Sequence, residues 1–128
     1  MAKFFETLRL KGRGRRKLIR LKISLNADLQ IATAEEESYL GFRTGDFGVG
    51  GMGIKMKEEE LQRVWVEDRK RINAIIRIPP DYQKEVRVAA RLAWTREEEE
   101  GIITGWEFTR FIGDAKKRIN QYVDAQQQ

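Results

Sequence analysis

Two short stretches, far apart in the sequence, carry complementary chemistry. Residues 15–20 read RRKLIR, and residues 46–51 read DFGVGG, an acid followed by a glycine-rich turn. Arginine presents a planar set of five donors that suits phosphate and the O6/N7 edge of guanine. A carboxylate accepts hydrogen bonds from the N–H groups of the opposite guanine edge, and glycine lets backbone come close to a ligand. Together the two stretches predict a site for a ligand that is both anionic and guanine-bearing.

Both stretches resemble signatures of the PilZ domain, a bacterial receptor for the second messenger cyclic di-GMP. Arg16 and Arg20 match the two arginines of its RxxxR motif, and Arg15 matches the basic residue that often precedes them. Asp46 and Gly51 match the first and last positions of its [D/N]xSxxG motif. Each motif is weak alone, because RxxxR occurs by chance in many basic proteins. Their order and spacing make the resemblance specific.

One position departs from the family pattern, since Gly48 stands where the family usually has serine. The later part of the chain also resembles the family: residues 90–94, ARLAW, are similar to its "A-x-V-x-W" strand, and residues 105–108, GWEF, to its "G-x-x-F" strand. The resemblance covers roughly residues 11–124, nearly the whole chain.

The resemblance implies a receptor and no enzyme. Cyclic di-GMP would bind, as an intercalated dimer, to Arg15, Arg16, Arg20, Asp46, Gly48 and Gly51, with no further cofactor and no metal. The arginines would contact phosphate and guanine, and Asp46 would accept from the guanine N1/N2 edge. We expect Arg16 and Arg20 to be exposed in a mobile arm, so that their loss would leave stability nearly unchanged. Ligand binding would order residues 12–16 and signal to an unidentified protein effector of motility or polysaccharide synthesis.

Composition narrows the alternatives. The 128 residues suffice for one domain, and the absence of cysteine and histidine removes thiol nucleophiles, Ser-His-Asp triads and the usual zinc and haem ligands. No apolar run reaches the length of about 18 residues that a membrane span needs. The N-terminus lacks the apolar stretch of a signal peptide, so the cytosol is the expected compartment.

Charge is concentrated at the N-terminus. Residues 1–25 hold nine basic side chains against one acid, whereas the whole chain carries a net charge of +5. This asymmetry favours an anion-binding arm. A solvated basic surface is the alternative interpretation, but glycines at positions 12 and 14, beside the basic cluster, suit a loop that closes on a ligand.

Alternating apolar residues predict an all-β fold, an antiparallel barrel of about six strands. The strands are expected at 18–25, from Leu29 to about Thr33, and at 39–44, 52–56, 72–78, 86–94 and 102–112. In the strand 86–94, alternation places Val86, Val88, Ala90, Leu92 and Trp94 on one face. Residues 26–28 are interpreted as a turn, 35–37 as a solvated bend and 97–101 as a hairpin connection.

Helical spacing of Ala115, Ile119, Tyr122 and Val123 predicts an amphipathic C-terminal helix over about 113–125. Residues 57–70 fit either a helical turn or a loop, and residues 1–10 form a lead-in with a short helix at 3–10. Residues 11–128 then make a single domain, and the PilZ resemblance implies a Greek-key barrel with a C-terminal helix.

Two other functions stay open. A degenerate PilZ-like adaptor would act through protein contacts without binding a nucleotide. An RNA-binding small barrel would stack bases on Phe42, Phe47 or Trp106, although the acidic remainder of the chain argues against a nucleic-acid partner.

Overall fold

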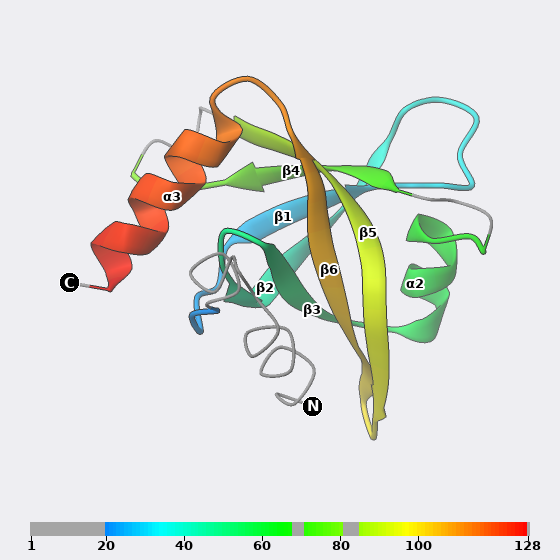
Figure 1. The fold of residues 1–128 in the computed structure, drawn as a ribbon. Coiled ribbons are helices and arrows are strands. Elements are labelled where there is room, and N and C mark those ends of the chain that lie inside the picture. The colour runs from blue at the N-terminus through cyan, green and yellow to red at the C-terminus, as the bar shows by residue number, and fades with distance from the viewer. Residues whose placement is uncertain (1–19, 68–70, 81–84, 128) are drawn as a thin grey trace.

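Six antiparallel strands close into a barrel in the order β1-β2-β3-β6-β5-β4 (Figure 1). The computed structural model describes residues 20–67, 71–80 and 85–127. Its elements are β1 (Asn26–Gln30), β2 (Tyr39–Phe47), β3 (Gly51–Met56), α2 (Glu58–Val64), β4 (Ile72–Arg77), β5 (Glu85–Glu98), β6 (Gly101–Phe111) and α3 (Ala115–Gln126). Strands β1 to β3 pair in sequence order, as do β4 to β6, and the pairs β3–β6 and β1–β4 complete the ring in a Greek-key arrangement. The predicted fold class is confirmed.

The barrel is filled by one face of each strand, and the two helices lie at different ends of it (Figure 1). Trp106 and Phe47 are the largest fully buried side chains. On the side of α2, the ring of Trp65 meets Trp106 edge-on at 5.8 Å between centroids. On the side of α3, Tyr122 meets Phe47 at 6.5 Å. Each helix is therefore anchored by an aromatic contact to the core.

Most predicted elements are confirmed. The strands expected at 39–44, 52–56, 72–78, 86–94 and 102–112 correspond to β2 to β6, and residues 35–37 are an exposed bend. The C-terminal helix is present as α3, with Ala115, Ile119 and Val123 buried as predicted. The open segment 57–70 contains the helix α2. The helix expected at 3–10 lies outside the described residues.

The start of the barrel differs from the prediction. Residues 26–28 are not a turn but the first part of β1. The strand expected at 18–25 is wrong over its described part, where Leu21 makes an isolated bridge with Phe47 and Leu25 is hydrogen-bonded to Thr44. Asn26 and Asp28 favour turns by their intrinsic preference. In the barrel they point outward and accept hydrogen bonds from Arg43 at 2.7 Å and Arg77 at 2.6 Å. Tertiary partners thus override the local preference.

Strand β5 contains a second difference. The pairing of β5 with β6 shifts register between Ala89 and Ala90 and again between Leu92 and Trp94. Leu92 pairs with the fully buried Trp106, whereas Trp94 pairs with Gly105. One extra residue moves every following side chain to the other face of a strand. Trp94 therefore lies on the outer wall, and the prediction that it shares a face with Leu92 is wrong.

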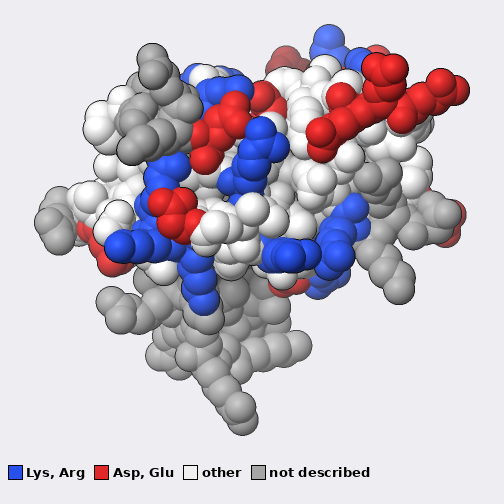
Figure 2. All heavy atoms as spheres, turned by 90° about the horizontal axis from the view of Figure 1, so that it is seen from above, with Lys and Arg blue, Asp and Glu red and all other residues white. Residues whose placement is uncertain are grey.

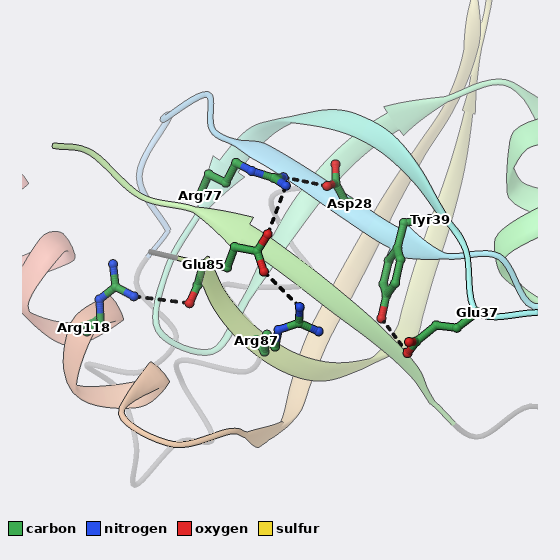
Figure 3. Close-up of polar contacts among 7 residues, drawn as sticks. All are labelled: Asp28, Glu37, Tyr39, Arg77, Glu85, Arg87 and Arg118. Carbon is green, nitrogen blue, oxygen red and sulfur yellow. Dashed lines mark hydrogen bonds and ion pairs between the residues drawn. The ribbon is translucent and has the colours of Figure 1, made fainter. Parts of the chain in front are cut away.

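A chain of ion pairs ties α3 to the wall made by β1, β4 and β5 (Figure 3). Arg77 donates to Asp28 at 2.6 Å and to Glu85 at 3.3 Å. Arg87 donates to the other carboxylate oxygen of Glu85 at 2.9 Å, and Arg118 of α3 donates to the Glu85 carbonyl at 3.3 Å. The arginines of this wall are engaged in holding the fold together.

Candidate ligand-binding site

Asp46 stands on the outer wall near the end of β2, beside the glycines Gly51 and Gly53 of β3. It pairs with Gly53 of β3, just after an irregularity in the β2–β3 register at Thr44 and Asp46. A Cβ atom on Gly53 would lie 2.6 Å from Asp46 Oδ2. Only glycine leaves room for the carboxylate at this position, so the acid lies flat against the barrel.

Arg20 is brought to Asp46 by the bridge that precedes β1. The backbone of Leu21 makes two hydrogen bonds with Phe47, of 2.9 and 2.8 Å, which set the neighbouring residue beside the β2–β3 hairpin. Arg20 Nη1 then donates to Asp46 Oδ1 at 3.1 Å, and Nη2 lies 2.6 Å from where a Cβ on Gly51 would be. The Arg20 side chain is only 10% exposed. The expectation that Arg20 is exposed is wrong, because the side-chain-free surface at Gly51 lets it pack down.

Burial lowers the pKa of the Arg20 guanidinium, and the charges of Asp46 and Glu107 and the hydrogen bond to Asp46 oppose that shift. Arginine stays protonated in proteins even when it is buried, so Arg20 carries its positive charge. Arg20 is thus a largely buried cation that is ion-paired to Asp46, with the charge of Glu107 near enough to act on it. A desolvated, oriented guanidinium is well suited to bind phosphate or guanine by paired hydrogen bonds.

The turn between β2 and β3 is fixed by backbone bonds. Gly48 N donates to Gly51 O at 2.9 Å, and Phe108 N of β6 donates to Gly50 O at 2.9 Å. Among the described glycines, those with left-handed backbone are Gly101 and Gly113. Gly48 is buried in this turn, but its backbone is not left-handed, so the backbone conformation alone does not require glycine there.

The register of β3, β6 and β5 extends the site beyond the predicted residues. Gly53 pairs with Gly105, and a Cβ on Gly105 would collide with the indole of Trp94. Gly51, Gly53 and Gly105 therefore form a glycine floor on the outer wall. Asp46 borders it on one side and Trp94 on the other. The sequence interpretation left Trp94 out of the site, since its outward direction depends on the bulge in β5.

The predicted site residues fall into three groups. Arg20, Asp46 and Gly51 lie together, and Gly48 lies in the adjoining turn. Arg15 and Arg16 lie outside the described residues, so their contribution stays a prediction. Among the described residues, no group of three or more acidic side chains is placed to hold a metal ion.

The face that lies uppermost in Figure 1 is shown with its charges in Figure 2. Acid side chains stand between the basic ones over the middle of this face, and further acids gather towards one corner. Nucleic-acid binding depends on a continuous run of basic groups along the phosphate backbone. The described residues form no such run on this face.

The helices of the described segments include none that is both long and apolar enough to span a membrane.

The model of the family described as "PilZ domain" matches residues 14–125, and this chain belongs to that family. No curated protein sequence matches significantly. Among solved structures, the inhibitor of motility MotI/DgrA of Bacillus subtilis has a TM-score of 0.65 at 15% identity, over 85% of this chain and 49% of that one. This chain therefore spans about half the length of MotI/DgrA.

Two further solved structures are of isolated PilZ domains. The domain of YcgR from Escherichia coli, solved with c-di-GMP, has a TM-score of 0.61 at 13% identity, over 84% of this chain and 87% of that one. The domain of CeSA from a cellulose-synthesizing bacterium has a TM-score of 0.53 at 16% identity, over 86% of this chain and 99% of that one. At these identities the likeness establishes the fold.

Proposed function

We propose that this protein is a cytosolic receptor for cyclic di-GMP, without catalytic activity of its own, that signals to a partner protein. The observation that carries the proposal is the juxtaposition of Arg20 and Asp46 on the glycine floor. These are the two residues that the family motifs pair with the ligand, and they come from segments 26 positions apart in sequence. Membership in the family and the ligand named for the YcgR domain support the same conclusion.

The chemistry of the site suits this ligand. The side chains of Arg20, Asp46 and Trp94 lie over Gly51, Gly53 and Gly105, so a guanine base would contact these three side chains, which the glycines allow to lie close to the barrel wall. Asp46 would accept from N1 and N2 of the base, and Arg20 would donate to phosphate or to the O6/N7 edge. In the structure the side chains of Arg20 and Asp46 pair with each other at 3.1 Å. The ligand therefore has to replace each partner, and it carries a phosphate for Arg20 and guanine N–H donors for Asp46.

The arm that contains Arg15 and Arg16 would complete the site over an intercalated pair of ligand molecules. Its ordering would present a new surface to the partner. Two structural neighbours, an inhibitor of motility and a PilZ domain from a cellulose-synthesizing bacterium, support an effector in motility or polysaccharide synthesis.

Calorimetric titration with cyclic di-GMP tests the proposal directly. GTP and cyclic AMP serve as controls, since each carries one purine nucleotide but not the cyclic dinucleotide. We expect saturable binding of cyclic di-GMP alone, with about one or two molecules per chain as the family resemblance implies. No heat with any of the three would remove the receptor function.

The second candidate is an adaptor that binds no nucleotide. The closed pair of Arg20 and Asp46 favours it, because both ligand-reading groups are engaged with each other and Arg20 is only 10% exposed. The same titration separates the candidates, since an adaptor leaves the closed pair undisturbed at any ligand concentration.

Gly48→Ser should bind cyclic di-GMP more tightly than the parent. Serine would restore the hydroxyl that the family motif supplies, and one neutral hydrogen bond contributes about 0.5–1.5 kcal/mol, roughly a twofold to tenfold gain. The backbone at Gly48 is not left-handed, so a side chain is not excluded on that ground. Titration of Gly48→Ser beside Gly48→Ala measures the hydroxyl alone. Equal weakening of both variants would instead mean that this buried turn has no space for a side chain.

Residues 11–20 should become protected against hydrogen exchange when cyclic di-GMP binds. The dianionic ligand would neutralise the repulsion among the basic residues of this segment and tie it to the barrel. Hydrogen exchange followed by mass spectrometry measures the change, with GTP at equal concentration as the control. Protection should be absent in Asp46→Ala, which lacks the guanine-reading acid. A segment already protected without ligand, and unchanged by it, would contradict the proposed switch.

A further inference from the structure

A second arginine–carboxylate pair borders the glycine floor on the β6 and β5 side. Glu107 of β6 lies opposite Gly51 of β3 on one side and opposite Arg91 of β5 on the other. Arg91 Nε donates to Glu107 Oε1 at 2.8 Å, and the two side chains are 49% and 40% exposed. Neither residue belongs to the RxxxR or [D/N]xSxxG motifs, and the family motifs leave both positions variable.

We propose that Arg91 is a further phosphate-binding residue of the site and that Glu107 occupies it until the ligand arrives. This inference rests on the proposed cyclic di-GMP binding. It adds that Glu107 sets the affinity, because its carboxylate stands in the place of a ligand phosphate.

The position of Glu107 supports this role. Arg20 Nη2 lies 2.6 Å from where a Cβ on Gly51 would be, and the Cβ of a residue directly opposite in an antiparallel pair lies about 5 Å away. Glu107 is that opposite residue; its carboxylate binds Arg91, and its charge also acts on Arg20. A phosphate that approaches either arginine meets its negative charge.

The position of Arg91 suits a ligand of this size. Two strand spacings separate it from Gly51, roughly 10 Å, a distance that an intercalated dinucleotide pair can bridge. Its bond to Glu107 uses Nε alone, and among the described residues neither terminal Nη group has a hydrogen-bond partner. The two Nη groups can receive a phosphate first, and release of Glu107 then leaves the edge formed by Nε and one Nη free for paired bonds to it.

Energetics favour the exchange. Exposed ion pairs contribute little to stability, so the Arg91–Glu107 pair opens at small cost. A charge-assisted bond to phosphate with paired donors is stronger than the single bond it replaces. Glu107 remains nearby after the exchange, however, and repels the dianion. The site therefore contains a further arginine for phosphate, Arg91, and an acid, Glu107, that lowers the affinity for cyclic di-GMP.

Titration of Glu107→Gln, Arg91→Ala and the double variant with cyclic di-GMP tests the proposal, with thermal melts to verify folding. We expect Glu107→Gln to bind about three- to tenfold more tightly at low salt, and less so at high salt as screening grows. Arg91→Ala should bind about five- to twentyfold more weakly. The gain from Glu107→Gln should shrink in the Arg91→Ala background, because the two effects act through one contact.

Two matched variants control for net charge. Glu98→Gln and Arg87→Ala change the same charges in exposed ion pairs of β5, of 3.2 and 2.9 Å, away from the glycine floor. Both should bind like the parent. A parent that binds while Glu107→Gln binds no more tightly, or more weakly, would overturn the inference and leave the receptor function intact. An undiminished gain in the Arg91→Ala background would reject Arg91 as a contact. No binding by the parent or any variant would remove the receptor function and this inference with it.

Discussion

Arg20→Ala should lose about tenfold to more than a hundredfold in affinity for cyclic di-GMP, since a charge-assisted contact contributes about 1.5–3 kcal/mol. Unlike an exposed arginine, Arg20 should also contribute to stability. Its side chain is 10% exposed, and its removal leaves Asp46 without its ion-pair partner. We therefore expect a measurable fall in melting temperature together with the loss of binding. Calorimetry and a thermal melt on the same preparation measure both.

Arg43→Ala is the matched control for this experiment. Arg43 is an arginine of β2 that bonds Ser24 and Asn26 on the surface. Its loss changes the net charge equally but leaves the glycine floor untouched, so binding should stay near that of the parent. Arg20→Lys adds a test of geometry, because lysine keeps the charge and loses the planar fork. Parent-like affinity in Arg20→Ala would show that the ligand does not use this arginine.

Gly51→Ala should damage both the site and the barrel. A Cβ at this position would collide with the backbone carbonyl of Trp106 and lie 2.6 Å from Arg20 Nη2. Arg20 can move aside, but the carbonyl belongs to the β3–β6 ladder and cannot move without shifting the strands. Overpacking of this kind costs about 1–3 kcal/mol and occasionally more. We expect a lower melting temperature and strongly reduced binding, because the displaced Arg20 no longer meets Asp46.

Gly45→Ala makes the same chemical change on β2 with little steric consequence. The nearest atom to its new Cβ would be Gly53 O at 4.0 Å, an ordinary van der Waals contact. Both stability and affinity should remain close to those of the parent. If Gly51→Ala behaved like Gly45→Ala, the close packing of Arg20 on the barrel wall would not be what positions it.

The bulge in β5 shows how a short-range pattern can mislead. Val86, Val88, Ala90, Leu92 and Trp94 alternate without interruption in sequence, so nothing local marks the extra residue before Trp94. The bulge is visible only in the pairing with β6. It turns Trp94 to the outer wall, where it borders the candidate site. A residue that looks like core by alternation is thereby placed beside the ligand-reading acid.

Local patterns in the sequence were sufficient to predict five of the six strands and the helix α3, whereas the ligand chemistry of Arg20 and Asp46 stays a prediction. Strand alternation, helical spacing and motif order are properties of neighbouring residues, and they can be read without knowing what each element packs against. The glycine cluster predicted a close approach to the backbone, and in the structure the side chains of Arg20 and Asp46 make such an approach at Gly51 and Gly53.

The tertiary structure decided what depends on pairing across the barrel. Asn26 and Asp28 became strand residues because Arg43 and Arg77 bind them, and Arg20 became buried because Gly51 leaves it room. Glu107 and Gly51 are 56 positions apart in sequence, and only closure of the barrel between β3 and β6 makes them neighbours. Register between distant strands is set by the packing of the whole core, since a shift of one residue would turn the buried face of a strand to solvent.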